Sequence, residues 1–200
     1  GAMLEEHDEA LRQQYAGVLP HVEDLHDVYK VLHAGRQRRG AMDFETTETQ
    51  IVFGEGKKID RIVPVTRNVA HRLIEECMLV ANVATARFLE KAKIPTLYRV
   101  HQGPAEQKLA DVRDFLSELG LSLGGGDEPQ AKDYAKLLEA VQGRSDAHLI
   151  QTVLLRSMRQ AVYTPDNEGH FGLAFDSYAH FTSPIRRYPD LLVHRAIRHV

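Results

Sequence analysis

The chain has 200 residues, of which 43% are hydrophobic and 26% are charged, and these proportions are those of an ordinary globular protein. The composition excludes an intrinsically disordered, a collagen-like and a coiled-coil protein. The formal net charge is only -3, so a polyanionic partner would have to be bound by a local cluster of basic residues. The length predicts a single domain with a substantial hydrophobic core.

Cys77 is the one cysteine, which excludes an internal disulfide and a zinc site built from thiolates. No stretch reaches the roughly 18 apolar residues of a membrane-spanning helix, and the start lacks the pattern of a secretory signal. We therefore expect a cytoplasmic protein with no membrane partner. Residues 1–3 have the composition of a tag remnant, and the helical patterns at both ends predict that residues 4–200 are a piece of a longer protein.

Apolar residues at helical spacing dominate the first ninety residues. Three helices are predicted from this spacing, over residues 4–16, 21–39 and 69–88. Gly40 is the expected stop of the second helix, and Thr66 or Asn68 is the expected cap of the third. Between the second and third helices, residues 50–53 and 59–65 predict a β-hairpin that turns at Gly54–Lys57.

Short strands and helices alternate in the second half of the chain. The predicted strands cover residues 96–101 and 171–175, and the predicted helices cover residues 104–119, 131–141 and 147–162. Gly124–Pro129 resembles a linker but is too short to indicate a domain boundary. We expect an α+β fold that is rich in helices, with a few short strands. Its sheet is expected to be incomplete, and the exposed edges and apolar surface would favour self-association.

The densest chemical signal lies between Tyr178 and Arg195, where several arginines and aromatic residues surround a single aspartate. Ser183 is a good helix N-cap and Pro184 suits the first helical position, so this segment predicts a helix N-terminus. Such a terminus attracts anions, and Arg186 adds a planar group that matches phosphate oxygens. The plainer alternative is a capped surface helix with solvated arginines, and spacing alone favours it.

Residues 178–191 (YAHFTSPIRRYPDL), followed by His194 and Arg195, resemble the signature of the catalytic domain of the RNase II superfamily, the processive 3′-to-5′ exoribonucleases. Residues 73–78, 98–101 and 170–174 are similar to the ribonuclease R branch of this superfamily. The resemblance covers residues 4–200 and places them in the central-to-late part of the catalytic domain. It implies an enzyme that binds the 3′ end of single-stranded RNA and hydrolyses single-stranded and structured RNA to nucleoside monophosphates.

The resemblance also implies roles for individual residues. Arg186 would be the catalytic residue that contacts the scissile phosphate and neutralises charge on its oxygens. Phe44 would stack on the 3′-terminal bases, and Glu75, with Glu76 as second choice, would lie near the terminal riboses. Without the resemblance, Phe44 is nearly as well explained as a core residue and the two glutamates as solvated side chains. The other residues to which it assigns RNA contact or support are Tyr178, His180, Ser183, Arg187, His194 and Arg195.

Members of this superfamily use Mg²⁺, held by closely spaced aspartates that lie upstream of the matched region. Here no two aspartates are closer than three residues, and the eleven histidines show no zinc-binding spacing. We therefore expect a Mg²⁺-dependent full-length enzyme, and an isolated chain that binds no metal and is inactive. Two alternatives remain open. One is a non-catalytic RNA-binding or partner-binding module on the same scaffold, and the other is an unrelated helical domain with a phosphate-binding cap.

Overall fold

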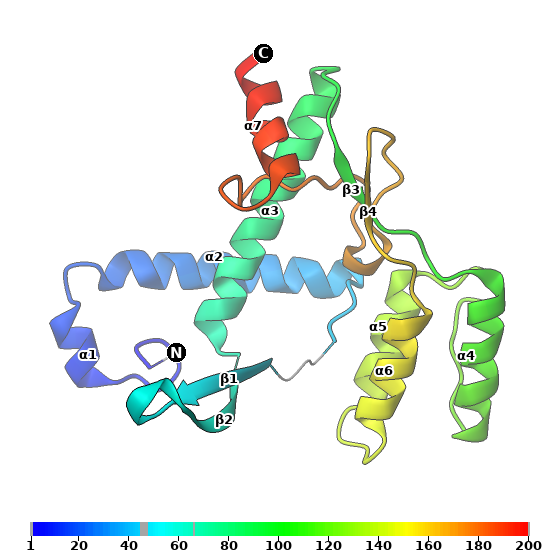
Figure 1. The fold of residues 1–200 in the computed structure, drawn as a ribbon, viewed down its shortest axis with the longest axis horizontal. Coiled ribbons are helices and arrows are strands. Elements are labelled where there is room, and N and C mark those ends of the chain that lie inside the picture. Colours follow the sequence, from blue (N-terminus) through cyan, green and yellow to red (C-terminus); the bar gives the residue numbers. More distant parts are fainter. Residues whose placement is uncertain (1, 45–47, 66, 200) are drawn as a thin grey trace. The chain divides into compact units, whose positions relative to one another are not determined.

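The computed structural model describes residues 2–44, 48–65 and 67–199 (Figure 1). It has the predicted α+β architecture, rich in helices and with a few short strands. Within the described ranges, no helix combines the length and the apolar character needed to cross a bilayer. The elements are, in chain order, α1 (Glu9–Gln14), α2 (Leu19–Arg39), β1 (Glu48–Phe53), the 3-10 turn η1 (Glu55–Lys57), β2 (Ile59–Val65), α3 (Val69–Lys91), β3 (Tyr98–Val100), α4 (Glu106–Glu118), α5 (Ala131–Ala140), α6 (Ala147–Ser157), β4 (Val162–Thr164), the 3-10 turn η2 (Phe171–Leu173) and α7 (Tyr188–His199).

Two compact units make up the chain. The first consists of residues 1–32 and 45–76, and the second of residues 33–44 and 77–200. The sequence predicted a single domain and did not indicate this division. The glycine-rich stretch Gly124–Pro129 lies inside the second unit, as expected for a loop that is not a domain boundary.

The first unit contains the antiparallel hairpin of β1 and β2, which confirms the predicted hairpin. Ile51 lies opposite Ile62, and the turn contains Gly56 at φ 67°, a backbone conformation that favours glycine. The hairpin carries large apolar side chains that are exposed, among them Phe53, Ile59 and Ile62. Self-association through such a surface stays a prediction.

α1 is shorter than the helix predicted over residues 4–16. It begins after Asp8, whose carboxylate accepts a hydrogen bond of 3.0 Å from the backbone N–H of Leu11. An N-cap aspartate inside the predicted segment thus fixes a later start than the apolar spacing indicated. α2 ends at Arg39 as predicted, and Gly40 follows it at φ 73°.

α3 confirms the long helix predicted in the middle of the chain and extends it to Lys91. Asn68 caps it: its side-chain oxygen accepts hydrogen bonds from the backbone N–H groups of Ala70 and His71, at 3.0 and 3.2 Å. Thr66, the other candidate cap, lies outside the described residues. The buried apolar residues of the helix recur at helical spacing and are Val69, Leu73, Leu79, Val83, Ala86 and Leu89.

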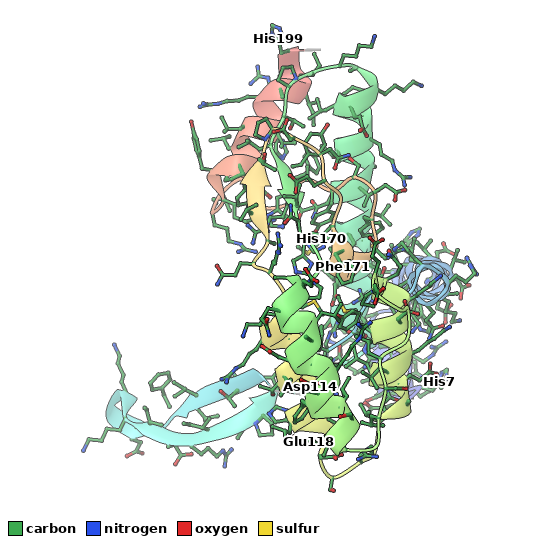
Figure 2. The ribbon with its side chains drawn as sticks, turned by 90° about the vertical axis from the view of Figure 1, so that its right-hand side faces the viewer. His7, Asp114, Glu118, His170, Phe171 and His199 are labelled. Atoms are coloured by element: carbon green, nitrogen blue, oxygen red, sulfur yellow. The ribbon has the colours of Figure 1, made fainter. Side chains whose placement is uncertain are left out.

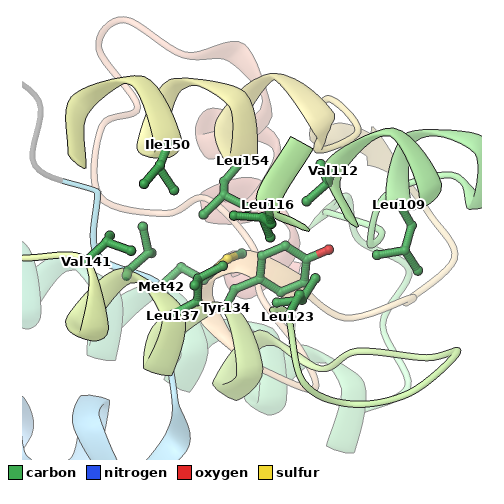
Figure 3. Packing of buried hydrophobic residues seen from close by; sticks show 11 residues of the cluster. Met42, Leu109, Val112, Leu116, Leu123, Tyr134, Leu137, Val141, Ile150 and Leu154 are labelled. Atoms are coloured by element: carbon green, nitrogen blue, oxygen red, sulfur yellow. The ribbon is translucent and has the colours of Figure 1, made fainter. Parts of the chain in front are cut away.

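The main core of the second unit lies among α4, α5 and α6 (Figure 3). Tyr134 is fully buried at its centre and contacts the ring of Phe171 edge-on, with 5.8 Å between the ring centroids. Phe44 is half-buried and packs against this cluster. The buried members are Met42, Leu109, Val112, Leu116, Leu123, Tyr134, Leu137, Leu138, Val141, Ile150 and Leu154.

β3 confirms the first strand predicted for the second half, and it pairs antiparallel with β4, which was not predicted. The helix predicted over residues 147–162 ends at Ser157, because Met158 takes an extended backbone conformation. Val162 then lies opposite Val100 and Thr164 opposite Tyr98. β-branched and aromatic residues favour this strand, but a strand of three residues forms only where a partner strand is available.

The strand predicted over residues 171–175 is wrong. These residues form η2 and a left-handed residue, Ala174, at φ 52°. The ring nitrogen Nδ1 of His170 accepts a hydrogen bond of 3.3 Å from the backbone N–H of Leu173, so a side chain satisfies a donor that a strand partner would otherwise satisfy. Figure 2 shows His170 and Phe171 between the β3–β4 pair and the helices of the main core.

Candidate functional site

Residues 183–187, here called the arginine turn, lead into α7 in the second unit. The carbonyl oxygen of Ser183 accepts hydrogen bonds from the backbone N–H groups of Arg186 and Arg187, at 3.2 and 3.0 Å. These two bonds close a tight turn.

The prediction that Ser183 caps a helix with Pro184 as its first residue is wrong. α7 begins only at Tyr188, after the arginine turn is complete. Pro189 has no backbone N–H and cannot continue a helical hydrogen-bond ladder from the turn. The turn and α7 are therefore separate elements.

Arg186 lies on the outside of the arginine turn. Its neighbour Ile185 is 97% exposed, the highest value among the exposed large apolar side chains, and Arg186 itself is exposed. Its guanidinium nitrogen Nη2 lies 3.4 Å from the hydroxyl oxygen of Ser183, and among the described residues no carboxylate comes within ion-pair distance of it. The guanidinium is thus available to an anion.

Asp190 closes the arginine turn from inside. Its side chain is fully buried, and its oxygen Oδ1 accepts hydrogen bonds of 2.8 Å from the backbone N–H of Ser183 and from the guanidinium of Arg187. The side chain of Arg187 is only 22% exposed. Two adjacent arginines therefore differ: Arg187 pairs with a buried carboxylate, and Arg186 faces solvent.

The segment before the turn is held by α3. The buried side chain of Asn82 donates a hydrogen bond of 2.9 Å to the hydroxyl of Tyr178 and accepts one of 2.9 Å from the backbone N–H of Phe181. Tyr178 is itself buried, so this contact, rather than an open ring face, is what the structure gives it. Burial is also the main cause that raises the pKa of the Tyr178 hydroxyl above its ordinary value.

α7 holds the same segment from the other side. The ring of His194 stacks on that of Phe181, with 4.3 Å between the centroids, and its Nε2 donates a hydrogen bond of 2.9 Å to the Phe181 carbonyl oxygen. Arg195, the next residue on α7, is exposed. Of these two predicted site residues, His194 supports the turn and Arg195 is open to a ligand.

His180 lies between two tyrosines. Its Nδ1 is 2.6 Å from the hydroxyl of Tyr163, and its ring contacts that of Tyr178 edge-on. Burial, and after it the nearby charge of Arg187, lowers the pKa of His180 to about 4. The imidazole is therefore neutral at physiological pH and connects neighbouring segments of the second unit.

Phe44 and Glu75 belong to different units. Phe44 is half-buried and packs against the main core of the second unit. Glu75 lies in the first unit and pairs with Arg67, while its neighbour Glu76 is buried.

A separate hollow of about 940 Å³ lies elsewhere in the second unit and contains no residue of the arginine turn. Three of its polar side chains already have partners. The Nδ1 atoms of His101 and His170 accept backbone N–H groups, and the Arg39 guanidinium lies 3.9 Å from the ring centroid of Phe175. We therefore place the candidate site at the arginine turn.

Within the described ranges, no three side chains of the histidine, cysteine, aspartate or glutamate type come together as possible metal ligands. Mg²⁺ needs several oxygen ligands, usually carboxylates together with substrate phosphate and water.

Two residues central to the site were not predicted, Asn82 and Asp190. Each carries a sequence signal in retrospect. Asn82 is a polar residue within the otherwise apolar pattern of the long helix, and Asp190 is the one acidic residue in the arginine-rich signature. A lone polar residue in such a position is a candidate for a buried hydrogen-bonding role.

Comparisons with known proteins agree with the resemblance predicted from the sequence. Ribonuclease R from Vibrio cholerae serotype O1 is 58% identical over 195 residues, which cover 98% of this chain and 24% of that protein. The chain thus spans about a quarter of the length of the curated relatives it matches.

Solved structures of Mycoplasma genitalium RNase R are similar at 29% identity. The complex with ribose methylated single-stranded RNA has a TM-score of 0.86 and is matched over 96% of this chain and 31% of that chain. The complex with double-stranded RNA has a TM-score of 0.87 and is matched over 98% and 36%. The family model described as RNB domain matches residues 2–200, both compact units included. This chain, with its arginine turn, therefore belongs to the RNB domain family.

Proposed function

We propose that the longer protein containing this chain is a processive 3′-to-5′ exoribonuclease of the ribonuclease R type, which hydrolyses single-stranded and structured RNA to nucleoside monophosphates. Membership of the RNB family supports this, as do the RNA complexes of the similar Mycoplasma genitalium enzyme. The observation that carries the proposal is the position of Arg186, which is exposed, has no carboxylate partner among the described residues, and lies on a turn that buried contacts hold.

Arg186 would act on the scissile phosphodiester. Its guanidinium is always charged and presents a planar set of donors that matches two phosphate oxygens. Phosphoryl transfer depends mainly on positioning and on stabilising the negative charge of the transition state. A guanidinium on a turn whose backbone is already fixed can provide both the positioning and the positive charge. Little conformational entropy is then lost when the substrate binds.

The proposal includes further RNA contacts. Arg195 is exposed on α7 and would bind the RNA backbone, since exposed arginines at an RNA site commonly contact phosphates. Phe44 would stack on a terminal base with its exposed part, and Glu75 would contact a terminal ribose. The remaining signature residues, Tyr178, His180, Ser183, Arg187 and His194, would support the turn by the contacts described above.

Mg²⁺ is part of the proposal as a cofactor of the full-length enzyme. When bound, such an ion supplies an activated water molecule for hydrolysis. Its ligands would be the closely spaced aspartates that the family resemblance places upstream of the matched region. The isolated chain is accordingly expected to hydrolyse no RNA, and Mg²⁺-dependent degradation by it would overturn this part of the proposal.

The test is a comparison of Arg186→Ala with the wild type in the full-length enzyme, using 5′-labelled single-stranded RNA. Loss of one donor to a transition state lowers kcat by about 10²–10³, while the Kd for RNA should change little. Arg186→Lys should also be poor, because a point charge does not replace the planar group.

The matched control is Arg144→Ala, which removes another exposed arginine of the same unit, one that pairs with Asp146. It should leave turnover unchanged. Unaltered turnover in Arg186→Ala would overturn the role of this residue. RNA binding without hydrolysis by the wild-type full-length protein would favour the non-catalytic module instead.

A further inference from the structure

We infer that Asp190 is the positioning residue that holds Arg186 toward the phosphate, and that Arg187 serves as the buried counter-ion of Asp190 rather than as an RNA contact. The inference rests on the proposed function, because it assigns a supporting residue to the same site. The two adjacent arginines of the signature thereby receive different roles, phosphate contact for Arg186 and charge pairing with Asp190 for Arg187.

The burial of the Asp190 carboxylate carries an energetic cost. Asp190 is 0% exposed, and moving a charged carboxylate out of water is strongly unfavourable unless it is paired and hydrogen-bonded. An apolar residue at this buried position of α7 would avoid that cost. A buried charge in such a place is best explained by the specific backbone conformation that it imposes.

Asp190 contacts both ends of the arginine turn. A single atom, Oδ1 of Asp190, accepts hydrogen bonds from the backbone N–H of Ser183 and from the side chain of Arg187, each at 2.8 Å. These donors belong to the first and last residues of the arginine turn. Arg186 lies between them, so the position of its backbone depends on both bonds.

These two hydrogen bonds have no substitute among the described residues. The other oxygen of Asp190, Oδ2, and the Nε of Arg187 are both buried, and neither has a hydrogen-bond partner among the described residues. If Arg187 turned outward to bind RNA, it would leave the Asp190 charge buried and unpaired. Arg187 is therefore committed to the interior, and of the two adjacent arginines only Arg186 is presented to the phosphate.

The expected consequence is a kinetic one. A displacement of about 1 Å in a positioned group costs up to about 100-fold in rate, even when the change lies away from the reacting atoms. In the full-length enzyme, Asp190→Asn keeps an oxygen that accepts from Ser183 but removes the charge that holds Arg187. We expect kcat to fall by about 10- to 100-fold and the Kd for single-stranded RNA to change by less than about threefold.

A double-mutant cycle with Arg186→Ala separates positioning from general loss of structure. If Asp190 acts through Arg186, Asp190→Asn lowers kcat in the wild-type background but adds less than about threefold in the Arg186→Ala background. A merely structural role would give the same factor in both backgrounds, and that result would overturn the inference.

A second variant covers the case in which Asp190→Asn does not fold. In Asp190→Asn with Arg187→Gln, both buried charges are removed and the two amides can hydrogen-bond to each other. This double variant should have an unfolding midpoint close to that of the wild type. Its kcat is then measured with and without Arg186→Ala, as in the double-mutant cycle above. If Asp190→Asn does fold, the pair should recover at least about tenfold of its lost kcat.

Asp146→Asn is the matched control, because it removes an aspartate from an exposed arginine pair in the same unit and should not change kcat. The two proposals fail in different ways. Unchanged turnover in Arg186→Ala would contradict the proposed function itself. Collapse of turnover in Arg186→Ala, together with equal Asp190→Asn effects in both backgrounds, would contradict only the positioning role.

Discussion

Asn82 and Tyr178 form a buried hydrogen bond of 2.9 Å between α3 and the segment that leads into the arginine turn. The same amide also accepts the backbone N–H of Phe181. One side chain thus satisfies two polar groups of a segment 96 and 99 residues further along the chain. Since unpaired polar groups are costly inside a protein, this contact ties the stability of the turn to the long helix.

Replacing Asn82 should therefore destabilise the second unit markedly. Asn82→Ala leaves the Tyr178 hydroxyl and the Phe181 N–H without this partner, and two such losses cost about 2–4 kcal/mol of the free energy of unfolding. Tyr178→Phe removes only the hydroxyl bond and should cost about 1–2 kcal/mol. Urea unfolding of both variants measures the difference. A Tyr178→Phe variant as unstable as Asn82→Ala would contradict the bridging role of the amide.

Acid should destabilise the fold through its half-buried histidines. The Nδ1 atoms of His101 and His170 accept the backbone N–H groups of Gly172 and Leu173, which requires that these nitrogens carry no proton. Burial is the main cause that lowers the pKa of both rings, that of His170 to about 3. Burial is also the main cause that lowers the pKa of His180, to about 4.

The direction in which stability changes with pH follows from the unfolded state, in which a histidine has a pKa near 6.5. Below that pH the unfolded chain binds protons that the folded chain does not, so stability is full above pH 6.5 and is lost as the pH falls toward 4 and 3. The slope is at most about 1.4 kcal/mol per pH unit for each histidine. Urea unfolding between pH 7 and 4 should show it.

His170→Gln should reduce this slope, whereas His148→Gln, at an exposed position of α6, should keep it. A free energy of unfolding that stays level or rises as the pH falls from 6.5 to 4 would refute the prediction.

Gly40 should tolerate no side chain. It follows α2 at φ 73°, and a Cβ there would lie 2.5 Å from the Cβ and 2.7 Å from the Cα of Lys132. Gly120 has a similar φ of 69°, and no atom lies within 4 Å of the place that a Cβ would take there. Gly120→Ala should thus lower the free energy of unfolding by about 1 kcal/mol, because alanine is strained in the left-handed conformation. Gly40→Ala adds a steric clash to this strain and should lower the free energy of unfolding by about 2–4 kcal/mol. Thermal unfolding compares the two, and equal losses would show that the clash is relieved without cost.

Local signals in the sequence account for much of the fold. Apolar spacing predicted α2 and α3 within a few residues, and alternation around Gly54–Lys57 predicted the hairpin. Capping chemistry is equally local, which is why Gly40 and Asn68 were recognised. The errors fall where distant partners decide. β4 forms because β3 lies beside it, and residues 171–175 form η2 because His170 and His101 accept backbone donors there.

By itself, the sequence determined the family, the helix-rich α+β class and the segment that carries the candidate chemistry. Each of these depends on which residue types occur close together along the chain. It could not distinguish Arg186 from Arg187, which have the same side chain and adjacent positions. Tertiary structure made that distinction by burying Asp190 against one of them and leaving the other in solvent. The physical reason is that burial and charge pairing depend on which segments contact each other in space, and the spacing of residues along the chain does not determine those contacts.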